Sequence, residues 1–191
     1  MVATPSTMLE LGTPLPSFRL SDFDGKLHST DDHKAKPVLV MFICNHCPFV
    51  IHVLEKLVEL AGLHQSKGIA VIGINSNDIK AYPDDSPVNM KKIAGRFQFS
   101  FPYLFDETQE VAKEFLAACT PDFYLFDASH HLVYRGQMDD SRPGNDIPVT
   151  GEDLTSAIDN LLDGKPISPD RKPSLGCNIK WKPGNEPNYF G

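Results

Sequence analysis

The sequence from Val38 to Pro48 is Val-Leu-Val-Met-Phe-Ile-Cys-Asn-His-Cys-Pro, an apolar run that ends in two cysteines separated by two residues. A continuous apolar run of this length predicts a buried strand, which carries a dithiol at its end. From Phe49 to Lys67, apolar residues recur at mixed three- and four-residue spacing, which predicts an amphipathic helix. The two cysteines therefore lie at a strand-to-helix turn, where the free N–H groups and the positive end of the helix dipole stabilise a thiolate.

This order of strand, Cys-x-x-Cys-Pro and helix resembles the active site of the thioredoxin superfamily. The chain looks most like its peroxiredoxin-like, AhpC/TSA-like and thiol-disulfide oxidoreductase branches. The resemblance extends over roughly residues 12 to 163, because it includes the segment Pro14–Lys26, the pair Thr120-Pro121 before an apolar strand, and the order of elements between them. It implies an α/β, thioredoxin-like three-layer fold with a central mixed sheet, an N-terminal β-hairpin and an extended C-terminal tail.

The chain divides into three segments by pattern. Residues 1–13 show no periodicity and are expected to form a loose arm, and residues 14–163 form the thioredoxin-like domain. The Asp-Gly turn in Asp22–Gly25 predicts the N-terminal hairpin. Residues 164–191 are rich in proline and glycine, but they also carry apolar side chains that a disordered tail usually lacks. We therefore expect the tail to pack on the domain, or else on a partner, through Leu175, Ile179, Trp181, Tyr189 and Phe190.

Further elements follow the first helix. Ile69–Ile74 is a second apolar run, so strand, helix and strand form a right-handed crossover unit. Asn75–Asp78 comes directly after it and is interpreted either as a polar turn or as part of a site, since open α/β sheets place their sites at this edge. Helices are predicted for Pro87–Phe97 and from Asp106 to Ala118.

Composition limits the classes of function. A hydrophobic content of 41% in 191 residues is enough for one domain with a buried core. The formal charge of −7 argues against nucleic acid or an anionic membrane surface as a partner. No run approaches the ~20 apolar residues of a membrane span. If the chain is the full translation product, a cytoplasmic location is expected, where cysteines are more often catalytic or metal-binding than bridged; a removed leader would reverse this expectation.

The resemblance assigns roles to the central residues. Cys44 is the expected nucleophile, and Cys47 is the thiol that resolves a mixed disulfide. His46 precedes the second cysteine, where an imidazole stabilises the thiolate, unless it merely caps the loop in solvent. We expect a depressed pKa for Cys44, from the helix N-terminus first and from His46 second. Thr120 and Pro121 match the superfamily's cis-proline site, in which the preceding backbone is open to pair with a substrate chain.

Two further cysteines are candidate accessory redox residues. Cys119 lies two residues before Pro121 and is interpreted either as redox-active or as a small buried apolar residue. Cys177 lies in the tail. It is expected to approach the Cys44 and Cys47 turn as a third redox partner, to pair with Cys119, or to remain far from both.

The sequence also departs from the patterns it resembles. The buried carboxylate of thioredoxins is replaced by Val38, and the glutamate of another branch by Val50. Peroxide reduction uses a Thr or Ser three residues before the reactive cysteine and an Arg beside it. Here Met41 occupies the first position and the neutral pair Thr120-Pro121 stands where the arginine would arrive. Both changes argue against efficient peroxide reduction.

The sequence therefore predicts a thiol-disulfide oxidoreductase that uses the Cys-Asn-His-Cys dithiol and acts on protein or small-molecule thiols and disulfides, with no cofactor. One alternative is a peroxiredoxin-like thiol peroxidase, with Cys44 as peroxidatic cysteine, hydroperoxides as substrates and an antioxidant role. A second is a module that binds Cu(I) or Zn(II) through Cys44, His46 and Cys47, with Cys119 or Cys177 as a candidate further ligand. A non-catalytic thioredoxin-like module also remains open.

Overall fold

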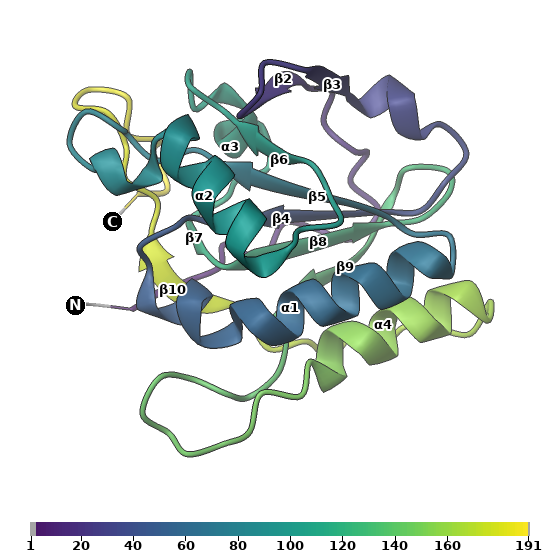
Figure 1. The fold of residues 1–191 in the computed structure, drawn as a ribbon. Helices are drawn as coiled ribbons and strands as arrows, with labels where there is room; N and C mark the ends of the chain where they lie inside the picture. The colour runs from purple at the N-terminus through teal and green to yellow at the C-terminus, as the bar shows by residue number, and fades with distance from the viewer. Residues whose placement is uncertain (1–2, 191) are drawn as a thin grey trace.

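The computed structural model of the protein describes residues 3–190 (Figure 1). Residues 1, 2 and 191 lie outside this range, so the expectations for the N-terminal arm and for the tail apply to their described parts. Seven strands form a mixed sheet in the order β3-β2-β6-β5-β4-β8-β9. Its strands are β2 (Arg19–Asp22), β3 (Leu27–Ser29), β4 (Val38–Phe42), β5 (Ala70–Asn75), β6 (Tyr103–Phe105), β8 (Asp122–Phe126) and β9 (Leu132–Gly136). The predicted α/β class with a central mixed sheet is confirmed.

A second, three-stranded sheet has the order β1-β10-β7. It consists of β1 (Thr4–Pro5), β7 (Cys119–Thr120) and β10 (Leu175–Asn178). The helices are α1 (Pro48–Ser66), α2 (Pro87–Phe97), α3 (Glu110–Glu114) and α4 (Glu152–Leu162), with 3-10 turns at Thr30–His33 and Pro83–Asp85. In the described chain, no helix combines the length and the apolar character that crossing a membrane requires.

Strand β4 is the centre of the large sheet. It pairs in parallel with β5 and antiparallel with β8, and all five of its residues are buried. Because side chains alternate across a strand, Leu39 and Met41 join one core cluster and Val38, Val40 and Phe42 join the other. Burial on both faces explains why the run is continuously apolar. Because the strand is held in the centre of the sheet, Cys44 is positioned just beyond its end.

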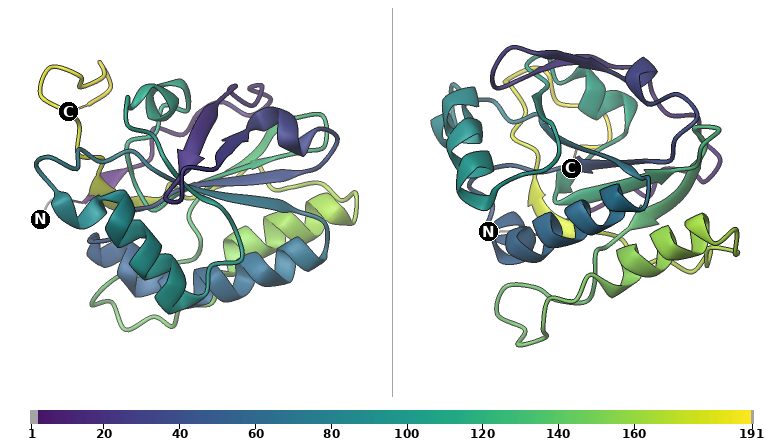
Figure 2. Two further views of the ribbon diagram at one scale, coloured as in Figure 1. Left: turned by 45° about the horizontal axis from the view of Figure 1, so that its top comes forward. Right: turned by 45° about the vertical axis from the view of Figure 1, so that its right-hand side comes forward.

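Helices α1 and α4 cover one face of the sheet and lie side by side (Figures 1 and 2). Their apolar residues Val53 and Leu57 of α1, with Leu154 and Ile158 of α4, are buried in one cluster with Leu39. Each such side chain contributes roughly 1.5–3 kcal/mol when fully buried. The opposite face is covered by α3 and by the tail residues Ile179 and Trp181.

The start of α1 places the second cysteine. Cys47 is the N-cap residue, with φ −68° and ψ 123°, and Pro48 occupies the first turn, where its missing N–H costs nothing. The helix therefore begins at Pro48, one residue earlier than the sequence pattern indicated. The sulfur of Cys47 lies at the positive end of a 19-residue helix.

The predicted helix from Asp106 to Ala118 is much shorter in the structure, where α3 spans only Glu110–Glu114. Asp106 binds the backbone N–H of Ala112 through its carboxylate at 2.9 Å, and Gln109 has a positive φ of 66°. The carboxylate of Asp106 therefore accepts a backbone N–H that a carbonyl of an earlier helical turn would otherwise accept, and the helix begins only at Glu110.

The small sheet joins an N-terminal segment to the tail. β1 pairs with β10, which in turn pairs with β7, and the hydroxyl of Ser6 donates to Asp122 at 3.2 Å. Residues 3–13, expected as a loose arm, thus include a short paired strand. β10 was not predicted, and it lies beside the start of α1 (Figures 1 and 2).

Candidate redox site

The dithiol lies at the junction of β4 and α1, buried beneath the surface. Cys44 is 3% exposed and Cys47 is fully buried. Their side chains are hydrogen-bonded to each other. All four cysteines are thiols in this structure. The site is therefore a reduced dithiol whose two sulfurs are hydrogen-bonded.

Thr120 faces both sulfurs. The Thr120–Pro121 peptide bond is cis, as the resemblance implies. Thr120 Oγ1 lies 3.3 Å from Cys44 Sγ, and the Thr120 carbonyl oxygen lies 3.2 Å from Cys47 Sγ. This residue therefore contacts each member of the dithiol through a different group.

The backbone before the cis-proline is not open, in contrast to what the resemblance implies. β10 pairs antiparallel with β7, so that Cys177 lies opposite Thr120 and Asn178 opposite Cys119. The close fit depends on Gly176, because a Cβ there would lie 2.0 Å from the Thr120 carbonyl oxygen. The chain's own tail thus occupies the edge that a substrate strand was expected to use.

This pairing brings a third cysteine into the site. Cys177 Sγ lies 2.7 Å from Cys47 Sγ, although 130 residues separate them in the chain. Cys119 is fully buried, and its thiol lies 3.7 Å from the carbonyl oxygen of Pro121. Burial raises the pKa of Cys119 well above the ordinary thiol value. The structure therefore places Cys177 in the dithiol cluster and Cys119 in packing next to it.

His46 binds a carboxylate that the sequence did not single out. Its Nδ1 lies 2.7 Å from Oδ2 of Asp85, a fully buried residue of the 3-10 turn Pro83–Asp85. The hydrogen bond to this carboxylate raises the pKa of His46 above its ordinary value. The imidazole also stacks on Tyr82, with ring centroids 5.4 Å apart and planes 6° from parallel. His46 is thus held by a buried acid and an aromatic ring.

Asp85 also fixes its surroundings. Its Oδ1 accepts the backbone N–H of Asn45 at 2.7 Å, and its Oδ2 accepts the side-chain amide of Asn77 at 2.7 Å. Asn77 in turn accepts the backbone N–H of Lys180 in the tail at 2.8 Å. The sequence offered one signal, since the polar residues 75–78 stand at the C-terminal end of β5, at the edge of the sheet. All four are buried: Asn75 and Asn77 bind Asp85, Asn77 and Asp78 bind Lys180 of the tail, and Ser76 binds Asp106, so they do more than form a turn.

The electrostatics of the dithiol differ from the expectation of an acidic Cys44. The hydrogen bond that Cys44 donates to Cys47 raises the pKa of Cys44, and burial and the charge of Asp85 raise it further. The same bond lowers the pKa of Cys47 to about 5, with further donation by the Cys177 thiol and by the backbone N–H groups of Val50 and Cys177. These donors outweigh burial, which acts to raise the pKa of Cys47. Both shifts make Cys47 the more acidic thiol of the pair.

A metal ion would find three ligand atoms nearby. Those of Cys44, His46 and Asp85 lie within 4.8 Å of one another, and thiolate, imidazole and carboxylate are all zinc ligands. However, Asp85 already accepts hydrogen bonds from Asn45 and Asn77 and pairs with His46. An ion would have to replace the His46 pairing, so the arrangement fits positioning of the loop better than metal binding.

Two residues bear on whether the site can reduce peroxide: Met41, which replaces the expected Thr or Ser, and the buried Arg135. Met41 is buried in the core. The buried Arg135 donates to Asp122 at 3.1 Å, with its guanidinium carbon 4.5 Å from the centre of the Tyr124 ring. This arginine therefore belongs to the far core cluster and not to the dithiol.

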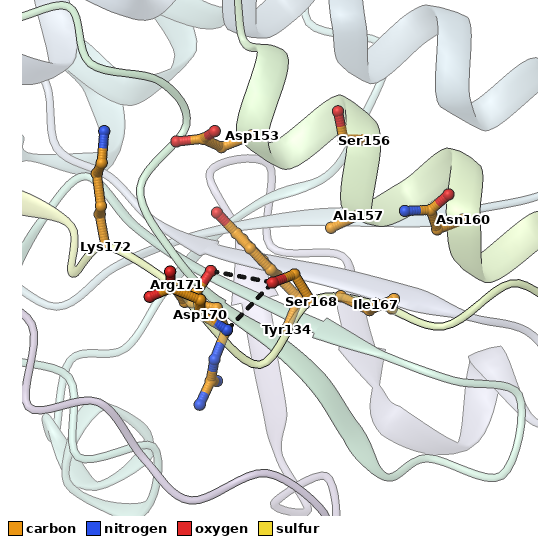
Figure 3. A pocket seen from close by; sticks show the side chains of 10 residues that line it. All are labelled: Tyr134, Asp153, Ser156, Ala157, Asn160, Ile167, Ser168, Asp170, Arg171 and Lys172. Atoms are coloured by element: carbon orange, nitrogen blue, oxygen red, sulfur yellow. Dashed lines mark hydrogen bonds between the residues drawn. The ribbon is translucent and has the colours of Figure 1, made fainter.

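A separate cavity of about 210 Å³ lies between β9, α4 and the segment 167–172. Figure 3 shows Tyr134 and Asp153 at this cavity, with Ser168 hydrogen-bonded to Asp170. None of the residues that line it is a cysteine or belongs to the His46 and Asp85 cluster. The cavity is thus not part of the redox site.

Comparison with known proteins agrees with this architecture. A family model described as the AhpC/TSA family matches residues 11–135. The thiol-disulfide oxidoreductase ResA of Geobacillus thermodenitrificans (strain NG80-2) is 27% identical over 124 residues, which cover 65% of this chain and 67% of that protein.

Two of the solved structures that resemble this chain differ in how much of it they match. An uncharacterized conserved protein from Geobacillus kaustophilus has a TM-score of 0.94 and 54% identity, covering 96% of this chain and 98% of that one. The thioredoxin domain of thiol-disulfide oxidoreductase BVU-2223 from Bacteroides vulgatus has a TM-score of 0.57 and 20% identity, covering 66% and 88%. At that identity the second shows the fold alone, and it confirms the thioredoxin-like prediction.

Proposed function

Because this chain belongs to the AhpC/TSA family and buries a reduced Cys-x-x-Cys against a cis-proline, we propose that it is a thiol-disulfide oxidoreductase. The observation that carries the proposal is the position of the dithiol, which lies at the N-terminus of α1 with both sulfurs in contact with Thr120 before the cis-proline. The relatedness to proteins named thiol-disulfide oxidoreductase supports the same reaction class. The substrates are thiols and disulfides of proteins or small molecules.

Cys44 is the proposed nucleophile. Cys47 is fully buried and is enclosed by the Thr120 carbonyl, Cys177 and the first turn of α1, whereas Cys44 retains some exposure. Transfer of the shared proton from Cys44 to Cys47 produces a Cys44 thiolate at the time of attack. The hydrogen bond with Thr120 Oγ1, at 3.3 Å, favours the charged form of Cys44.

The reaction balances in two exchanges. The Cys44 thiolate attacks a substrate disulfide, which forms a mixed disulfide and releases one substrate thiolate that takes up the Cys47 proton. The Cys47 thiolate then attacks Cys44 Sγ, the Cys44–Cys47 bond forms, and the second substrate thiolate leaves. The protein is oxidised by two electrons and the substrate is reduced by two. The reverse sequence oxidises a substrate dithiol.

Asp85 and His46 act as positioning residues in this proposal. Asp85 holds the N–H of Asn45 and the imidazole of His46, the two residues between the cysteines. A fixed loop keeps the sulfurs within exchange distance of each other, which reduces the entropy lost when the disulfide forms.

The test compares two reactions of the fully reduced protein in stopped flow: reduction of a small disulfide and consumption of hydrogen peroxide. Rapid disulfide exchange that is lost in both Cys44→Ser and Cys47→Ser supports the proposal. The buried Cys119→Ser serves as the matched control and is expected to retain the exchange. Rapid peroxide consumption with negligible disulfide exchange would instead show a thiol peroxidase with Cys44 as the peroxidatic residue.

A further inference from the structure

Three thiols, not two, meet at this site, and the third arrives on the tail strand. Cys47 Sγ lies 2.7 Å from Cys177 Sγ and is also hydrogen-bonded to Cys44. Thr120 organises the cluster, because its hydroxyl meets Cys44, its carbonyl meets Cys47, and its backbone pairs with Cys177. Cys47 therefore contacts both of the other two thiols.

The position of Cys177 is set by several independent contacts. Gly176 permits the close approach to Thr120, as no Cβ fits between them. Beyond the strand, Ile179 and Trp181 are buried in the second core cluster. Lys180 donates its backbone N–H to Asn77 and accepts the N–H of Asp78 at 2.7 Å. The tail strand is thus anchored on both sides of the cysteine, which preorganises the thiol beside its neighbour.

We propose that Cys177 is a third redox residue, which exchanges with the Cys44–Cys47 disulfide to form a Cys47–Cys177 disulfide within the same chain. This inference rests on the proposed function, since the first disulfide comes from reduction of a substrate. It assigns to the tail strand a catalytic thiol that the reaction of the dithiol alone does not require.

The step needs no additional oxidant. The Cys177 thiolate attacks Cys47 Sγ, the Cys47–Cys177 bond forms, and the Cys44–Cys47 bond breaks. Cys44 leaves as a thiolate and takes up the proton that Cys177 lost, so charge and oxidation level are unchanged. An oxidised molecule thereby regains a thiol at Cys44.

The reduced protein keeps Cys177 protonated until this step. Burial, and then the hydrogen bond to Cys47, raise the pKa of Cys177 to about 12. Once Cys47 is in a disulfide, the negative charge on that sulfur is gone, and two of the causes that hold the proton on Cys177 are removed. The exchange therefore follows oxidation of the dithiol and does not compete with it.

The experiment maps disulfides in the wild-type protein after oxidation with a small substrate disulfide and equilibration in a glutathione buffer. Acid quenching, alkylation and peptide mass analysis then identify each bridge. We expect two intramolecular bridges, Cys44–Cys47 and Cys47–Cys177, with Cys44 alkylated in the second population. Finding only the Cys44–Cys47 bridge at equilibrium, or a bridge that joins Cys177 to Cys119, would overturn the inference.

Variants separate this inference from the proposed function. In Cys177→Ser, the alkylated Cys44 of the oxidised protein should disappear, whereas Cys119→Ser should keep both bridges. If wild-type protein reduces the disulfide and forms only Cys44–Cys47, the third thiol has no redox role and the dithiol function stands. If wild-type protein neither forms Cys44–Cys47 nor turns over, the proposed function itself fails, and this inference fails with it.

Discussion

The buried carboxylate of Asp85 binds Nδ1 of His46 at 2.7 Å with one oxygen. Its other oxygen binds the backbone N–H of Asn45 at 2.7 Å, so a single acid holds both residues that separate the two cysteines. The thioredoxin pattern places its buried carboxylate elsewhere, at the position of Val38 in this chain. Here the acid comes from a 3-10 turn that follows β5.

Replacing Asp85 by Asn should lower the pKa of His46, because the carboxylate is the largest cause of its elevation and burial acts in the opposite direction. The loss of the buried hydrogen bonds should also cost about 1–3 kcal/mol of folding free energy. Titration of the His46 ring protons by NMR measures the first effect. Asp84→Asn, at the exposed neighbour, is the control, and an unchanged His46 pKa in Asp85→Asn would contradict the assignment.

Reduced protein should show a thiolate that titrates with a pKa of about 5, assigned to Cys47. Because the pKa of Cys47 is depressed on folding, the unfolded chain binds more protons between pH 5 and the ordinary thiol range. The stability of the reduced protein should therefore rise with pH through that window and be lost as pH falls through about 5.

Ultraviolet absorbance of the thiolate and denaturant unfolding at several pH values measure both effects. Cys47→Ser should abolish the acidic absorbance step, and Cys119→Ser should leave it in place. Persistence of that step in Cys47→Ser, with its loss in Cys44→Ser, would assign the thiolate to Cys44 instead.

The reduction potential should fall by ~30 mV per pH unit over this same window. The dithiol then carries one proton, since Cys47 has lost its own and the raised pKa of Cys44 retains the other. Two electrons accompanied by one proton give half the slope of a fully protonated dithiol. Equilibration with glutathione at a series of pH values provides the measurement, and a slope of ~60 mV throughout would show that neither thiol is acidic.

Gly176→Ala should weaken docking of the tail, because the added Cβ would lie 2.0 Å from the carbonyl oxygen of Thr120. Overpacking of this kind typically costs roughly 1–3 kcal/mol. Gly95→Ala in α2 is the matched control, since nothing lies within 4 Å of its Cβ. Amide hydrogen exchange should accelerate in β10 of the first variant only, and equal protection of β10 in both would show that the close approach is dispensable.

The elements around the dithiol were predictable from sequence because their signals are local. Continuous burial of β4 produces an apolar run, and the periodicity of α1 is contained within its own residues. The cis-proline followed from the resemblance, since the chain around Thr120 and Pro121 offers no local signal of that isomer. The cytoplasmic location stays a prediction.

The rest depends on contacts between distant segments. Leu175–Asn178 shows no alternation of its own, and it is a strand only because β1 and β7 flank it. The role of Asp85 arises from the approach of the 3-10 turn to the dithiol loop. Cys44 was expected to be acidic because of the helix N-terminus and His46. Cys177, which the sequence did not place, supplies two of the donors that lower the pKa of Cys47 instead.

The pairing of β10 with β7 has a consequence for the nascent protein. Cys177 is synthesised 130 residues after Cys47, and chains fold from the N-terminal side as they emerge from the ribosome. Until β10 reaches Thr120, the dithiol lacks the donors of Cys177, so Cys47 is a weaker acid in a partly made chain. The surroundings that lower the pKa of Cys47 are thus complete only after the segment through Trp181 has left the ribosome and docked.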